Sequence, residues 1–281
     1  MIQIHHWRED LTPIMAFPFI DPVLARFGPV EIRWYGLMYL VGFAVAFLII
    51  RSEFKRKNGP LPVDAAGDFL FYLIMGLMIG ARLGYALFYN LDVYLSRPWE
   101  ILAVWRGGMS FHGGMIGMIV SGWIFARSRN VAFLELADIA AISVPIGLMA
   151  GRIGNFINGE LYGRVTSAPW GIVFPDGGPL PRHPSQLYEA VFEGPILFLI
   201  LWLLRRRMNV NGGILSLFII FYGLFRFCIE FFREPDVQLG YLYFGLTMGQ
   251  ILCLLMIIGG LTLMFTLRRL NGSRNESPGL S

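Results

Sequence analysis

Charged side chains recur at helical spacing inside one strongly apolar stretch in the last quarter of the chain. Tyr222, Arg226, Glu230 and Arg233 are separated by four, four and three residues, so they share one face of a helix. Ionisable groups within membrane segments are costly and usually face a bundle interior or a wet cavity. The face could bind an anionic group, or Arg226 and Glu230 could form an internal ion pair that only orients helices.

A second concentration of polar residues is the segment GRIGNFINGELYGR, residues 151–164. Its four glycines are expected to break the helix at the membrane surface, while Arg152, Asn155 and Glu160 supply hydrogen-bonding groups and charge. Polar, irregular backbone at that depth is tolerated only where it lines a cavity or is buried in protein. The segment is therefore predicted to form part of a binding site.

Two further ionisable residues stand alone in apolar surroundings. Arg82, in GARLGYALFYN, could extend along its own stem to the membrane surface or could belong to the site. His112, in FHGGMIG, is followed by two glycines that allow close approach of a ligand. A lone histidine is more often structural, but a helix start disfavours its charged form and would keep it available as a neutral base.

These residue types together favour a phospholipid ligand. Arginine binds phosphate with paired, charge-assisted hydrogen bonds, and several arginines beside apolar spans suit an anionic head group with hydrocarbon tails. The sequence has no serine-nucleophile motif, zinc signature or nucleotide loop, and Cys228 and Cys253 read as structural thiols in apolar stretches. We expect no cofactor and no metal, and a nucleophile supplied by a second substrate.

The elements that must position these residues are membrane helices. The 281-residue chain is 56% hydrophobic and 15% charged, with a mean hydropathy of +0.59, which argues against a water-soluble domain. A bilayer helix needs about 20 mostly apolar residues, so the sequence predicts an all-α, polytopic integral membrane protein with about seven transmembrane helices. The expected spans are 33–51, 66–89, 110–127, 132–150, 187–204, 212–232 and 242–267.

Basic residues determine the expected orientation. Short Lys and Arg runs follow the first, third, fifth and seventh spans, and such runs are retained in the cytoplasm. The N-terminus is thus predicted to be outside (periplasmic) and the C-terminus cytoplasmic. Because the basic residues form no single basic domain, nucleic acid is not an expected partner. Residues 1–270 are expected to form a single transmembrane catalytic domain and residues 271–281 a disordered cytoplasmic tail.

Six motifs carry a resemblance to a known family. They are IRWYGLMYLVGF at 32–43, GARLGYALFYN at 80–90, GGMSFHGGMIG at 107–117, GRIGNFINGELYGR at 151–164, LPRHPSQLYE at 180–189, and YGLFRFCIEFFREPD at 222–236. At these motifs the sequence resembles the bacterial prolipoprotein diacylglyceryl transferases. The resemblance implies a seven-span fold in the bacterial cytoplasmic (inner) membrane, with the active site toward the periplasm. It also implies transfer of the diacylglyceryl group of phosphatidylglycerol to the lipobox cysteine thiol of lipoprotein precursors, which forms a thioether and releases glycerol phosphate.

The resemblance also implies roles for individual residues, to which we add Arg82 because of its position. The residues expected to act in catalysis are His112, Arg226, Tyr35 and Glu230. Those expected to bind phosphatidylglycerol are Arg152, Asn155, Glu160, Arg226, Tyr222, Arg233 and Arg82. A thiol attacks as its thiolate, so His112, or the positive field of Arg226 and Arg152, would raise the thiolate fraction. The arginines would neutralise charge on the departing phosphate.

Two other classes of protein are alternatives. A transporter or lipid flippase could bind an anionic substrate with the same arginines, but such folds commonly show paired half-repeats, and no repeat is visible here. A purely structural membrane subunit would leave the arginines in the outward connections unexplained. Formation of a diacylglyceryl-modified peptide separates both alternatives from a transferase.

Overall fold

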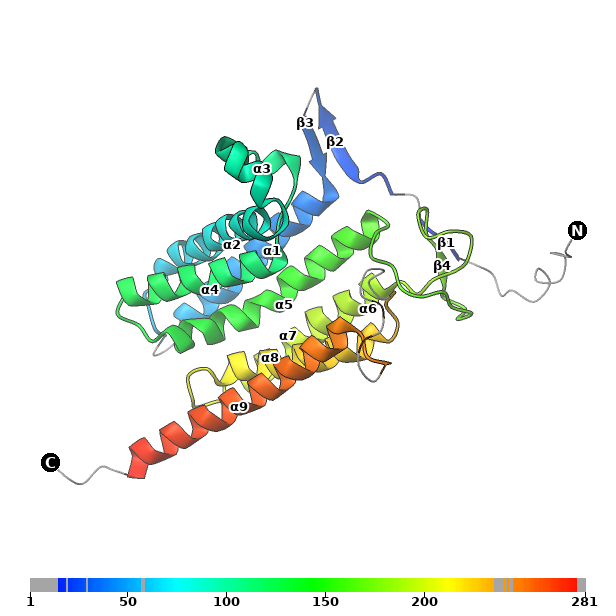
Figure 1. Cartoon of the computed structure of the whole chain (residues 1–281). Helices are drawn as coiled ribbons and strands as arrows, with labels where there is room; N and C mark the ends of the chain where they lie inside the picture. Colours follow the sequence, from blue (N-terminus) through cyan, green and yellow to red (C-terminus); the bar gives the residue numbers. More distant parts are fainter. Residues whose placement is uncertain are drawn as a thin grey trace, which may run out of the picture. The chain divides into compact units, whose positions relative to one another are not determined.

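The computed structural model describes residues 15–18, 20–28, 30–56, 59–234, 240, 242 and 245–276. Helices dominate the chain (Figure 1). It divides into two compact units. Unit 1 comprises residues 1–45 and 141–281, and unit 2 comprises residues 46–140. Helices α1 (Trp34–Phe54) and α5 (Phe133–Ile157) each run from one unit into the other.

Unit 2 is built on the close pairing of α2 (Ala65–Tyr89) with α4 (Phe111–Ser128). Glycines allow the two backbones to touch: a Cβ atom on Gly84 would lie 2.7 Å from the Cα atom of Gly113. The short helix α3 (Leu91–Ser96) and two 3₁₀ turns, η1 (Pro98–Leu102) and η2 (Val104–Arg106), connect them. The apolar core of this unit includes Phe54, Phe69 and Phe125.

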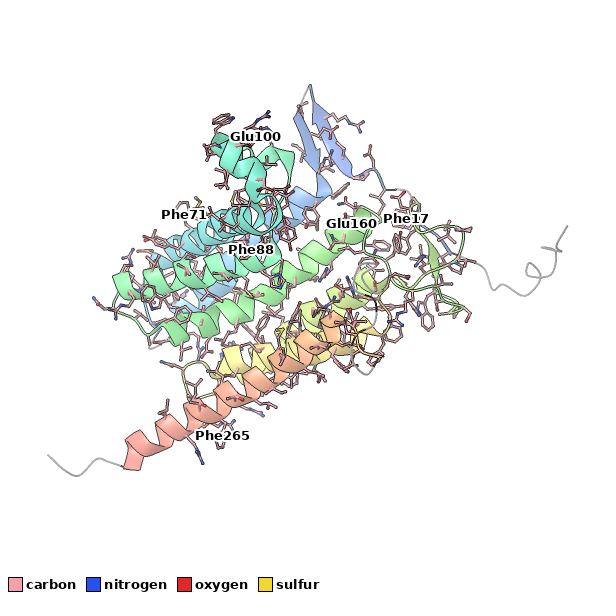
Figure 2. All side chains as sticks on the ribbon, viewed as in Figure 1. Phe17, Phe71, Phe88, Glu100, Glu160 and Phe265 are labelled. Carbon is pink, nitrogen blue, oxygen red and sulfur yellow. The ribbon has the colours of Figure 1, made fainter. Side chains whose placement is uncertain are left out.

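One face of the α2 and α4 pair is apolar. It carries a groove of about 530 Å³ lined by side chains such as Phe71 and Phe88, both largely exposed and marked in Figure 2. In a water-soluble protein, large apolar side chains that lie side by side are normally buried rather than exposed as one large patch. Their exposure is what a helix pair in contact with lipid tails requires.

Unit 1 contains the remaining long helices. Helix α8 (Gly213–Glu230) packs along α9 (Met248–Glu276). Helices α6 (Ser185–Val191) and α7 (Leu197–Leu204) form one span interrupted by a π-turn, η3 (Phe192–Ile196). Gly194 there has non-helical angles (φ −97°, ψ −108°), and Pro195 lacks the N–H needed for a regular helical hydrogen bond.

Two small sheets and a folded connection complete unit 1. Strand β1 (Met15–Ala16) pairs in parallel with β4 (Ile172–Val173), and β2 (Val23–Phe27) forms an antiparallel hairpin with β3 (Val30–Arg33). The connection between α5 and α6 is not an irregular loop throughout. The Gly163 amide donates to the His183 carbonyl, and the Arg164 amide donates to that of Phe232, so backbone hydrogen bonds order it.

The structure confirms a mostly helical fold of a polytopic membrane protein. Among the described residues, the helices long and apolar enough to cross a bilayer are Trp34–Phe54, Ala65–Tyr89, Phe133–Ile157, Ser185–Leu204, Gly213–Glu230 and Met248–Gly272. The remaining expected span, 110–127, is helix α4, but its glycines, His112 and Arg127 make it less apolar than those six. The seven-span count and the orientation stay predictions.

One local prediction was wrong. The helix does not break at Gly151, because α5 continues through Gly151 and Gly154 to Ile157, and the left-handed backbone comes only at Gly159 (φ +69°). Helix α9 extends to Glu276, and the disordered cytoplasmic tail expected at 271–281 stays a prediction. Residues 277–281 lie outside the described part of the chain.

Candidate active site

Glu189 on α6 is the centre of a group of buried charges in unit 1. Its side chain is fully buried, and three guanidinium groups surround its carboxylate. Arg152 Nε lies 2.5 Å from Oε2, Arg233 Nη1 donates to Oε1 at 2.6 Å, and Arg226 Nη1 lies 3.2 Å from Oε1. One carboxylate therefore draws together arginines from α5, from α8 and from the turn that follows α8.

Glu230 provides a second carboxylate to the same arginines. Its Oε2 lies 3.0 Å from Arg226 Nη2 and 3.4 Å from Arg233 Nε, and its Oε1 accepts a hydrogen bond from the Thr247 hydroxyl at 3.0 Å. The Arg226–Glu230 pair expected from helical spacing is thus present. It is not a pair confined to one helix, because Arg226 also reaches Glu189 on α6.

Glu193 lies one helical turn beyond Glu189, in the π-turn. It is fully buried, and neither of its carboxyl oxygens has a hydrogen-bond partner within the described chain. Arg152 Nε lies 3.8 Å from its Oε2. We call the six residues the Arg–Glu cluster: Arg152, Glu189, Glu193, Arg226, Glu230 and Arg233. Its formal charges cancel when all three carboxyl groups are ionised.

Some arginine donors of the cluster are not used. Arg226 Nη1 and Arg233 Nε are buried and make no hydrogen bond to any described residue, although carboxylates lie close by. Most buried donors in folded proteins are hydrogen-bonded, so such atoms indicate a site for an acceptor. Parts of the guanidinium-bearing side chains also stay accessible, since that of Arg152 is 21% exposed whereas Glu189 is fully buried. The cluster can therefore accept an oxyanion in a largely apolar setting.

The end of α5 holds the expected residues Asn155 and Glu160 together. Asn155 Nδ2 donates to Glu160 Oε1 at 2.8 Å, and the Glu160 amide donates to the Asn155 carbonyl at 3.0 Å. Gln186 on α6 donates to the Glu160 carbonyl at 2.6 Å. Figure 2 marks Glu160 at this end of α5, near Phe17. These contacts connect the end of α5 to α6, and a role for either residue in lipid binding stays a prediction.

Two tyrosines predicted to belong to the site, Tyr35 and Tyr222, lie on α1 and α8. Tyr35, in the first turn of α1, packs its ring on α5 at Gly154, where an added Cβ would collide with the ring at 2.5 Å. Its hydroxyl lies 3.3 Å from that of Tyr39. Tyr222 lies one turn before Arg226 on α8, and its ring stacks on Phe218. The close fit of Tyr35 explains why a glycine occurs in the last turn of α5.

Comparison with known proteins identifies the family. The family model for prolipoprotein diacylglyceryl transferases matches residues 22–266. The chain belongs to this family. It is 56% identical over 255 residues to the phosphatidylglycerol–prolipoprotein diacylglyceryl transferase of Geobacter sulfurreducens, covering 91% of this chain and 98% of that protein. The protein of the same name from Oleidesulfovibrio alaskensis is 52% identical over 252 residues, which cover 89% of this chain and 94% of that protein. The one from Pseudomonas aeruginosa is 50% identical over 252 residues, which cover 89% of this chain and 95% of that protein.

As a member of the prolipoprotein diacylglyceryl transferase family, the chain is a transferase. Two of the residues predicted to act in its site, His112 and Arg82, lie in unit 2. His112 is exposed in the first turn of α4, with its ring 5.6 Å from that of Phe111. Its membership of one site with the Arg–Glu cluster stays a prediction. Arg82 is buried on α2, but its guanidinium is bound to backbone carbonyls of the same unit rather than left free as expected for a phosphate ligand.

Glu189 and Glu193 were not among the residues predicted to form the site. Their spacing of four residues inside an apolar span is the same signal that singled out the face of α8. His183, which precedes α6, was likewise not assigned. Its Nδ1 lies 3.0 Å from the Tyr188 hydroxyl, which accepts a hydrogen bond from Trp170 Nε1 at 2.7 Å. That hydroxyl can therefore donate to His183, and burial lowers the pKa of the imidazole, so both effects favour a neutral ring.

The described residues contain no group of three or more His, Cys, Asp or Glu side chains arranged to hold a metal ion.

Proposed function

We propose that the chain transfers the diacylglyceryl group of phosphatidylglycerol to the lipobox cysteine thiol of a lipoprotein precursor, forming a thioether and releasing glycerol phosphate. The relatives carry names that state these substrates. The observation that supports the lipid half of the reaction is that two buried donors, Arg226 Nη1 and Arg233 Nε, make no hydrogen bond within the described chain, although carboxylate oxygens lie 3.2 and 3.4 Å away. A phosphodiester presents the oxygens that such donors require.

The Arg–Glu cluster is proposed to bind the phosphate through Arg152, Arg226 and Arg233. Their planar guanidinium groups can each make two parallel hydrogen bonds to phosphate oxygens. Glu189 and Glu230 hold those groups in place, so that little reorganisation is needed when the lipid binds. The carboxylates also limit the net charge of the site, which lets the product anion dissociate.

The chemical step is a displacement at carbon. The thiolate sulfur attacks the glyceryl carbon that bears the phosphate oxygen, a C–S bond forms and the C–O bond breaks. The bonding electrons go to the phosphate oxygen, and glycerol phosphate leaves. The thiol proton is proposed to pass to His112 as base and then to the departing phosphate, so atoms and charge balance.

The proposed topology has seven spans, a periplasmic N-terminus and a cytoplasmic C-terminus in the bacterial inner membrane. The alternate Lys and Arg runs support it. On this topology the α5–α6 connection and the end of α8 both face the periplasm. The active site would then open on the side where lipoprotein precursors arrive.

One assay tests the function directly. The purified protein is incubated with phosphatidylglycerol and a synthetic lipobox peptide, and the product is examined by mass spectrometry. The expected product is a peptide heavier by one diacylglyceryl group, and the same peptide with serine in place of cysteine should be unchanged. A folded protein that binds phosphatidylglycerol but gives no modified peptide would overturn the proposal and favour the flippase alternative.

A further inference from the structure

Arg82 uses its whole guanidinium group on the backbone of one connection in unit 2. An arginine side chain has five N–H donors. All five are directed at backbone carbonyls between 2.6 and 3.1 Å away, and the residue is only 6% exposed. The acceptors are the carbonyls of Glu100, Ile101, Ala103, Gly107 and Gly108. We call Arg82 and these five carbonyls the carbonyl clamp.

The clamp holds a segment with little regular structure of its own. Residues 98–108 consist of two short 3₁₀ turns, followed by Gly107 (φ +79°) and Gly108 (φ +82°) in conformations that side-chain-bearing residues rarely adopt. Carbonyls in such a segment lack the partners that a long helix would provide. Arg82 supplies those partners from one point on α2, and its guanidinium also lies 5.4 Å from the ring centre of Tyr94.

The segment leads directly to His112. The Ser110 amide donates to the carbonyl of Ala81, the neighbour of Arg82, at 2.9 Å. The Ser110 hydroxyl then caps α4 by accepting a hydrogen bond from the Gly113 amide at 3.2 Å. Two adjacent residues of α2 therefore fix both the approach to α4 and its first turn, where His112 lies.

We propose that Arg82 is a positioning residue that sets the orientation of His112 through residues 98–110, and is not a ligand of the lipid phosphate. A phosphate oxygen could bind Arg82 only after displacing a carbonyl already bound. This inference rests on the proposed role of His112 as base in the transferase reaction. Lysine cannot replace Arg82, because its ammonium has three donors and no planar fork.

Steady-state kinetics of Arg82→Lys separate the two roles. A positioning residue should lower kcat about tenfold or more and leave the KM for phosphatidylglycerol within about threefold, because misplacement affects the chemical step rather than lipid binding. Arg97→Gln is the matched control, since Arg97 precedes the same segment but is largely exposed at the surface. Its kinetics should equal those of the parent. A raised KM for Arg82→Lys with kcat retained would overturn the proposal.

Hydrogen exchange gives a readout that does not depend on transferase activity. The amides of Ser110 and Gly113 should exchange faster in Arg82→Lys, while those of α8 in unit 1 should exchange as in the parent. Unchanged exchange at Ser110 would overturn the clamp even if the transferase function holds. Faster exchange at Ser110 in Arg82→Lys, together with a parent protein that transfers no lipid, would support the clamp and contradict the proposed function.

If Arg82→Lys also loosens α8, the test uses Arg82→Gly with free guanidinium added. Recovery of the transfer rate by guanidinium, and not by methylammonium, supports the clamp. No recovery by guanidinium overturns it.

Discussion

The Arg–Glu cluster of unit 1 and the carbonyl clamp of unit 2 both bury arginine in a membrane protein, but with different partners. In the cluster, arginines face carboxylates and keep donors that have no hydrogen bond. In the clamp, Arg82 faces neutral carbonyls and keeps none. Burial alone therefore does not reveal the role of an arginine. The role is indicated by the N–H donors that make no hydrogen bond, because only a guanidinium with such donors can bind a further anion.

The largest effect is expected for Glu189, the central residue of the Arg–Glu cluster. Glu189→Gln keeps the shape of the side chain but removes the charge shared by Arg152, Arg226 and Arg233. Breaking a buried ion pair costs about 3–5 kcal/mol, so we expect transfer to fall about 1,000-fold. Initial rates of peptide modification measure this, with Glu31→Gln in the exposed β2–β3 hairpin as control. A rate within about threefold of the parent would show that the Glu189 carboxylate is not needed to hold the arginines.

His112→Gln should have the next largest effect. The glutamine side chain cannot accept and release a proton at neutral pH, and general base catalysis contributes about 100-fold or more. We expect kcat to fall by about that factor while the KM for phosphatidylglycerol changes little. The measurement is the same rate assay over a range of lipid concentrations. If the rate stayed within a few-fold of the parent, the role of His112 as base would be abandoned.

A smaller loss is expected for Arg226→Lys. Lysine keeps the positive charge but loses the fork that contacts Glu189 and Glu230 and offers Nη1 to phosphate. We expect kcat/KM to fall about 20-fold, mainly through a higher KM for phosphatidylglycerol. An unchanged KM would argue against specific recognition of the phosphate by this residue.

The smallest effect is expected at Glu193. Its carboxyl group is buried without a hydrogen bond, an arrangement that gives an ionised carboxylate little stabilisation. Glu193→Gln should therefore keep kcat/KM within about threefold and leave thermal stability unchanged or raised. A large loss of activity in this variant would show that Glu193 must carry a charge or move a proton.

Sequence reasoning succeeded where the partners lie on one helix. The spacing of Arg226 and Glu230 predicted a pair that the structure confirms. The partners of Glu189 could not be predicted in this way, because Arg152 and Arg226 each lie 37 residues from it in the chain. No periodicity reports such contacts, and only the packing of α5, α6 and α8 brings them together.

The same limit explains Arg82 and the α5 helix. Arg82 was expected either to extend to the membrane surface or to belong to the site. Its partners are instead backbone carbonyls, which the types of the side chains in the sequence do not reveal. The glycines at 151 and 154 predicted a helix break, but Gly154 admits the ring of Tyr35 while the helix continues. A glycine in a membrane helix can thus mark close packing as well as a break.

The central claim is that the Arg–Glu cluster, and not Arg82, binds the lipid phosphate. Titration of phosphatidylglycerol into the protein, followed by native mass spectrometry, measures this most directly for the parent, Arg226→Lys and Arg82→Lys. We expect the apparent Kd to rise about tenfold or more in Arg226→Lys and to stay within about twofold of the parent in Arg82→Lys. Equal affinity in the parent and Arg226→Lys, or a loss of binding in Arg82→Lys alone, would contradict the claim.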